Sequence, residues 1–209
     1  KAVSDSKQNT LTASYARKFL TDYMTLKKQK GELSDLDKEN LVQSFMDSLE
    51  PMAVADEYSA VDIKIASDTN DIVKKYATEM KKIFIDEKQG LISEPETFKT
   101  LMENIKGGNP DFKKNIEGLN YSVSKYEELI KKLLALIVPE ELAGNHLEAI
   151  NGFNNVKFAI KNMTLAPVDP VKAVMGRKLY DIELKRAYGA LIDMQNIFDK
   201  YKIYVFNIL

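Results

Sequence analysis

The sequence predicts an all-α protein, an elongated bundle of six or seven helices. Three apolar stripes in its second half advance by alternating steps of four and three residues, a period of about three and a half that is typical of long helices packed lengthwise. Proline stands where three helices are expected to begin, at positions 110, 139 and 170. Only 61–65 and 203–206 alternate apolar and polar residues as strands do.

The N-terminal part predicts two helices. The first is expected over 4–30 and is closed by Gly31; a helix of this length suits a stalk. Its apolar positions include Leu11, Tyr15, Phe19 and Tyr23, with Leu20, Met24 and Leu26 beside them. Ser34 and Asp37 resemble a capping box, so a second helix is expected to begin there and to stop before Pro51.

The two alternating runs predict a minor two-stranded ribbon between 61–65 and 203–206. The segment 203–206 is too hydrophobic for a free tail, and 61–65 is the one segment of matching period. Two other outcomes stay open for this segment. It could continue the last helix, or it could be an exposed strand with which a partner pairs.

Capping chemistry marks the remaining helices. Residues 68–71 can cap a helix that runs to about 86, and Pro95 can open a shorter helix that Gly107 and Gly108 end. A long helix is expected over 110–138. Asn109 and Asp169 are expected to cap the helices that follow them.

The three stripes define the faces that should form the core. The first comprises Phe112, Ile116, Leu119, Val123, Tyr126, Ile130, Leu133 and Ile137. The second comprises Leu142, His146, Ala149, Phe153, Val156, Ile160 and Met163. The third comprises Tyr180, Leu184, Ala187, Leu191, Met194, Phe198 and Tyr201. We expect one helical domain over 1–209, with 1–30 as a stalk-like N-terminal helix.

Composition excludes several classes of function. The chain has no cysteine, which removes disulfides, thiolate metal sites and thiol nucleophiles. Its 30 basic residues are balanced by 31 acidic ones, so nucleic acid is not an expected partner. The chain starts at Lys1 rather than Met, from which we expect that a signal peptide, an anchor or a tag was removed. Membrane contact is expected only through such a missing N-terminal segment.

No motif for catalysis, a cofactor or a metal is present. His146 is the single imidazole and lies on an apolar stripe, so it is expected to be a hydrogen-bonded core residue; a zinc site would need further ligands. Aromatic residues on neighbouring helices offer one further possibility, a cleft for an apolar or cationic ligand. That cleft would comprise Tyr121, Tyr126, Tyr180 and Tyr188, with His146 nearby. Ordinary core packing is the simpler explanation of such aromatics.

Three groups of residues resemble a group of uncharacterised helical proteins from small-genome bacteria. They are Tyr58 followed by 61–65, the Val138-Pro139 pair with His146, and the Asp169-Pro170 pair with Tyr180. The resemblance covers 34–206. It implies an exported protein held by an N-terminal membrane segment, and its motifs identify no active site.

The sequence therefore favours a non-catalytic, extracytoplasmic helical interaction or scaffold domain with protein partners. Its place would be a cell-envelope assembly such as a secretion or pilus-like apparatus. The alternative is a ligand-binding receptor domain with the aromatic inter-helix cleft, and an enzyme such as a hydrolase ranks third.

Overall fold

A computed structural model describes residues 10–87 and 93–206. Within these residues the chain is all-α, with seven α-helices and one very small sheet. The helices are α2 (Leu11–Lys30), α3 (Asp35–Ser48), α4 (Asn70–Glu87), α5 (Glu94–Lys106), α6 (Phe112–Leu134), α7 (Ala143–Met163) and α8 (Pro170–Lys200). The strands β1 (Lys64–Ala66) and β2 (Ile137–Pro139) and the short 3-10 helices η1 (Ala60–Asp62) and η2 (Glu140–Leu142) complete the described structure. The predicted fold class is confirmed.

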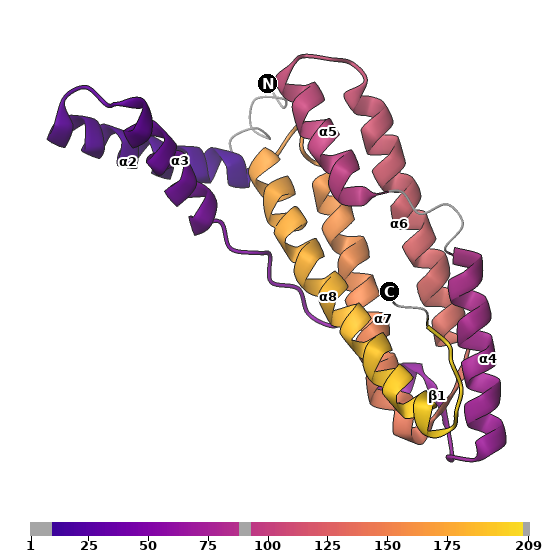
Figure 1. Ribbon diagram of the computed structural model, residues 1–209. Coiled ribbons are helices and arrows are strands. Elements are labelled where there is room, and N and C mark those ends of the chain that lie inside the picture. Colours follow the sequence, from indigo (N-terminus) through magenta and orange to yellow (C-terminus); the bar gives the residue numbers. More distant parts are fainter. Residues whose placement is uncertain (1–9, 88–92, 207–209) are drawn as a thin grey trace.

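The elongated bundle is built around α7. Figure 1 shows α6, α7 and α8 side by side along its length, with α5 at one end and α4 at the other. All seven residues of the second predicted stripe are buried, as are seven further residues of α7. A helix that is apolar on several faces must be covered on several sides, and α6, α8 and η2 cover α7.

Two glycines allow α7 and α8 to approach closely. A Cβ atom on Gly152 of α7 would lie 2.9 Å from the Cβ of Ala187, and one on Gly176 of α8 would lie 2.8 Å from the Cβ of Asn162. The two helices thus carry one glycine each at places where no side chain fits. The hydrogen side chain is the reason these positions can pack backbone to backbone.

The helix predicted over 110–138 is shorter at both ends. It starts at Phe112 with Asp111 at the cap position, so the expected cap at Asn109 was wrong. Asn109 instead accepts a hydrogen bond from the Asp111 N–H (3.0 Å) in a turn before the helix. It ends at Leu134, and Ile137 is 52% exposed in β2 instead of lying on the core stripe. Pro139 explains the change, since the residue before a proline is driven out of the helical conformation.

The small ribbon exists, but one of its predicted strands was wrong. β1 pairs in parallel with β2, with Ile65 opposite Val138, whereas 203–206 forms no strand. Lys202 has a left-handed backbone conformation (φ 57°) that turns the chain back onto α8. There the Gln195 side chain accepts hydrogen bonds from the Val205 and Phe206 N–H groups, each 3.0 Å long. The tail is therefore tied down as expected, but by a side chain of α8.

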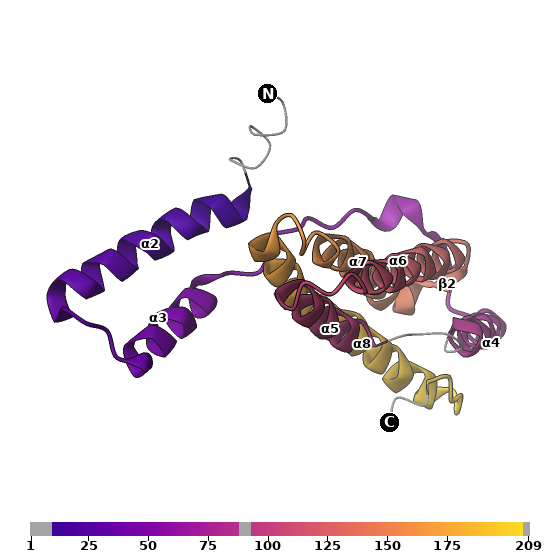
Figure 2. The same ribbon diagram turned by 90° about the horizontal axis from the view of Figure 1, so that it is seen from above.

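A two-helix arm, α2 and α3, projects from the bundle. Figure 2 shows α2 running away from the bundle and α3 returning toward it. Gly31 ends α2 with a positive φ of 79°, and Ser34 and Asp37 form the predicted capping box of α3. The part of the predicted first helix before residue 10 lies outside the described residues. The single-domain and stalk expectations stay predictions.

No helix in the described ranges 10–87 and 93–206 combines the length and apolarity that a bilayer crossing requires.

Candidate functional site

His146, near the start of α7, lies in the bundle core. It is fully buried; its Nε2 lies 3.2 Å from the Leu133 carbonyl oxygen and its Nδ1 lies 2.8 Å from the Tyr76 hydroxyl. A carbonyl only accepts, so Nε2 carries the proton and Tyr76 donates to Nδ1. Both nitrogens of the neutral ring are thereby satisfied. Burial lowers the pKa of His146 from 6.5 to about 4, against the opposing effect of the Leu133 carbonyl.

The tyrosines proposed for a cleft divide into two groups. Tyr126 and Tyr180 are buried between helices, and Tyr188 is 42% exposed beside them. Tyr121 is 47% exposed, and the ammonium of Lys125 lies 5.6 Å from the centre of its ring. His146 contacts Tyr76 rather than this group. The structure therefore brings together three of the five candidate residues.

Glu94, at the first position of α5, joins these three tyrosines. Its side chain is buried, and its Oε2 accepts a hydrogen bond from the Tyr180 hydroxyl (3.1 Å). Burial, followed by the charge of Glu94, raises the pKa of both Tyr126 and Tyr180, so these phenols stay protonated. Tyr126 and Tyr188 each pack against Phe153, with ring centres 6.1 and 6.4 Å apart.

One oxygen of this buried carboxyl group is unsatisfied. Oε1 of Glu94 has no hydrogen-bond partner among the described residues. A buried acceptor without a donor is costly, and phenol rings around it would suit a cationic donor. No sequence pattern pointed to Glu94, because a glutamate in the first turn of a helix is ordinary capping chemistry.

A second polar group fastens the segment before η1 to the bundle. The side-chain amide of Asn151 accepts a hydrogen bond from the Tyr58 N–H (3.0 Å) and donates one to the Tyr58 carbonyl oxygen (2.9 Å). Arg186 of α8 binds Asp56 with two parallel hydrogen bonds of 2.6 and 2.7 Å and binds Glu148 of α7 at 2.6 Å. Because these contacts join the segment before η1 to α7 and α8, the group holds the fold together. A run of asparagines at 151, 154 and 155 within an apolar helix was the sequence signal for it.

The arm is attached to α8 at both of its ends. At the start of α2, the Asp169 carboxylate accepts hydrogen bonds from the N–H groups of Leu11 and Thr12, each 3.0 Å long. The same carboxylate caps α8 through the Lys172 N–H (3.3 Å). At the end of α3, the Lys178 ammonium donates to the carbonyl oxygens of Met46 and Leu49, each at 2.8 Å. The arm is therefore held in place although little of it packs on the bundle.

The arm buries little of its own apolar surface. No residue of α2 or α3 is buried. Tyr15 and Phe19 pack on Phe45 of α3, with ring centres 6.1 and 5.2 Å apart. About 100° further round α2, Leu20 is 59% exposed and Met24 is 58% exposed.

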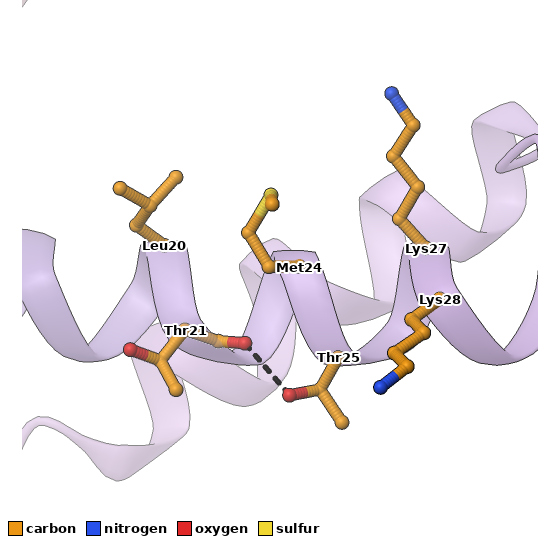
Figure 3. Close-up of a pocket in the computed structure, with 6 residues that line it drawn as sticks. All are labelled: Leu20, Thr21, Met24, Thr25, Lys27 and Lys28. Carbon is orange, nitrogen blue, oxygen red and sulfur yellow. Dashed lines mark hydrogen bonds between the residues drawn. The ribbon is translucent and has the colours of Figure 1, made fainter.

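We call this second face of α2 the open stripe; it consists of Ala13, Ala16, Leu20, Met24 and Lys27. Its members follow one another at intervals of three or four residues, the spacing of a helix-packing surface. Figure 3 shows that Leu20, Met24 and Lys27 project from the same side of α2. A shallow hollow of about 620 Å³ lies here, lined by Leu20, Thr21, Met24, Thr25, Lys27 and Lys28.

Comparison of the chain with models of protein families, with curated proteins and with solved structures found no match.

Proposed function

We propose that this protein is a non-catalytic interaction domain, a scaffold that binds a protein through the open stripe of its arm. The observation that carries the proposal is the exposure of Leu20 and Met24 on an arm whose two ends, the start of α2 and the end of α3, are fixed to the bundle. Fully burying one such side chain contributes roughly 1.5–3 kcal/mol, so a partner helix that covers both gains appreciable binding energy.

The surroundings of the open stripe suit a protein partner. Lys27 and Lys28 lie beside the exposed apolar side chains, so the surface combines an apolar centre with a polar edge. The hollow is shallow and follows one helix, which fits a helix laid alongside better than an enclosed small molecule. The arm also projects clear of the bundle, where a partner meets little obstruction (Figure 2).

The cellular setting is the broader part of the proposal. We place the domain outside the cytoplasm, in a cell-envelope assembly such as a secretion or pilus-like apparatus. The resemblance of 34–206 to exported helical proteins of small-genome bacteria supports this placement. It is independent of the argument from the open stripe.

A charge placed in the open stripe tests the proposal. Leu20→Asp is compared with Asp22→Lys, which changes an exposed charge on another face of the same helix. Each variant is cross-linked reversibly in the native cells and purified. We expect partner proteins to be recovered with the wild type and with Asp22→Lys, but not with Leu20→Asp. Circular dichroism should show that both variants are folded. Equal recovery of the same partners by both variants would count against the open stripe.

A ligand-binding domain is a second candidate, favoured by the unsatisfied Oε1 of Glu94 among three tyrosines. The expected ligand is a small organic ammonium ion, which would pair with the carboxylate and contact aromatic rings. Titration with tetramethylammonium and methylammonium should then shift the NMR signals of Tyr180 and Tyr188. Loss of those shifts in Glu94→Gln would support this candidate, and a wild type that shows no shift would remove it.

A further inference from the structure

We infer that the partner of the open stripe is a second copy of this chain, and that the two α2 helices pack antiparallel with Leu20 at the centre. The inference rests on the proposed function, because it names the occupant of the same surface. One property of α2, the order of its small and large side chains, points to this occupant. Two others, the position of its basic residues and the location of the bundle at one end, favour the antiparallel direction.

The first property is self-complementarity of size. In an antiparallel pair centred on Leu20, Ala16 of one copy faces Met24 of the other, and Ala13 faces Lys27. Each small side chain therefore meets a long one, and Leu20 meets its own counterpart on the two-fold axis. Such alternation lets helix surfaces interlock, and a patch that matches itself is what a two-fold interface requires.

The second property is charge. Lys27, Lys28 and Lys30 lie in the last turn of α2. A parallel pair would place these residues of both copies together at one end, where like charges repel. An antiparallel pair separates the two basic ends by nearly the length of α2, about 30 Å for 20 residues at 1.5 Å per residue. It also aligns the two helix dipoles in opposite directions.

The third property is the place of the bundle. The bundle is attached at the start of α2, through Asp169, while the tip of the arm near Gly31 projects away from it (Figure 2). In an antiparallel pair the two bundles lie at opposite ends of the joined arms. A parallel pair would bring both bundles to the same end of the joined arms.

The absence of cysteine from the chain makes a clean cross-linking test possible. In the purified full chain, Leu20→Cys should form a disulfide-linked dimer under mild oxidation, since the two Leu20 positions meet on the axis. Asp22→Cys is the matched control, as it lies on another face of α2. Its dimer should form at least tenfold more slowly.

A second pair of variants tests the direction of packing. Ala16→Cys alone should cross-link slowly, because its two copies are eight positions apart along the pair. A mixture of Ala16→Cys with Met24→Cys should give the heterodimer rapidly. Rapid self-linking of Ala16→Cys would overturn the antiparallel arrangement.

The mass of the native chain completes the test. Sedimentation equilibrium from about 5 to 500 µM should show a monomer–dimer equilibrium that Leu20→Asp abolishes while keeping the wild-type circular dichroism. Self-association would be overturned if the wild type stayed monomeric over this range and Leu20→Cys formed its disulfide-linked dimer no faster than Asp22→Cys. If Leu20→Asp nevertheless loses its partners in cells, the open stripe binds another protein and only the present inference fails.

Discussion

His146 shows at the residue scale how packing determines a protonation state. Its ring is neutral because the site is fully buried and because the Leu133 carbonyl and the Tyr76 hydroxyl fit one tautomer of the uncharged ring. The sequence predicted a hydrogen-bonded core histidine from its position on an apolar stripe, and the structure confirms this. The identity of Tyr76 as its partner, 70 residues away, could not be predicted, since no local pattern links the two positions.

The free energy of unfolding should decrease as the pH is lowered, because of His146. Its pKa is about 4 when folded and 6.5 in the reference state, so the unfolded chain takes up the proton first as pH falls. The contribution of His146 is complete above pH 6.5 and is lost between pH 6.5 and 4, amounting to about 3 kcal/mol at 1.36 kcal/mol per pH unit. Urea unfolding across this range measures it.

His146→Ala is the matching variant. It should cost about 1–3 kcal/mol at pH 7 through lost packing and hydrogen bonding, and it should lose less further stability on acidification than the wild type. If the free energy of unfolding of the two proteins changed with pH in parallel, this account of His146 would be contradicted.

Asp169 caps two helices with one carboxylate. Asp169→Ala should lower the free energy of unfolding by about 1 kcal/mol, leave helical content nearly unchanged, and speed amide hydrogen exchange at Leu11 and Thr12.

Burial opposes ionisation, yet hydrogen bonds from Thr12, Lys172 and Leu11 outweigh it and lower the pKa of Asp169 below 3.8. The stabilisation is therefore present above pH 3.8 and is lost as pH falls through the lowered folded value. Unchanged exchange at Leu11 would show that Asp169 does not hold the arm.

At the scale of elements, the contact between α7 and α8 depends on small residues. Gly176→Ala should destabilise the protein by about 1–3 kcal/mol, because its Cβ would lie 2.8 Å from the Asn162 Cβ and 2.9 Å from the Ala159 carbonyl oxygen. Gly189→Ala in the same helix is the control; nothing lies within 4 Å of its new Cβ, and it should stabilise by roughly 0.5–1 kcal/mol. The thermal unfolding temperature should be lower than that of the wild type in Gly176→Ala and higher in Gly189→Ala. A change in the same direction for both variants would refute the close contact.

The C-terminal segment depends on Gln195. Gln195→Ala removes the acceptor of the Val205 and Phe206 N–H groups, so their amide exchange should accelerate, and the protein should lose about 1 kcal/mol. Asn196→Ala, at an exposed neighbouring position, should leave that exchange unchanged. Slow exchange at Val205 in Gln195→Ala would mean that another contact holds the segment.

Helix positions and faces could be predicted, but contacts between distant segments could not. The stripe from Leu142 to Met163 predicted a helix that the structure buries at every marked position. Periodicity also predicted a strand over 61–65, where the structure has the 3-10 helix η1 over 60–62 and the strand β1 over 64–66. The partner of β1 proved to be 137–139, since a period alone does not specify which segments pair. Glu94 was missed for a related reason: only the fold brings it to Tyr180, 86 residues away.

At the scale of the whole molecule, a well-packed bundle carries an arm that has little core of its own. The bundle buries most residues of its apolar stripes, whereas α2 packs one face on α3 and leaves Leu20 and Met24 exposed. Contacts at both ends of the arm fix this surface relative to α8. We therefore expect the bundle to provide the stability of the fold, and we propose the arm as the recognition surface.

A photo-cross-linking scan along α2 tests this assignment most directly. A photoreactive amino acid is placed singly at exposed positions from Ala16 to Lys28, and adducts are counted in the native cells. We predict maxima at Ala16, Leu20, Met24 and Lys27, the period of one helix face, and minima at Lys18 and Asp22. A profile that is flat along α2, or that peaks at Lys18 and Asp22, would contradict the claim that the open stripe is the binding surface.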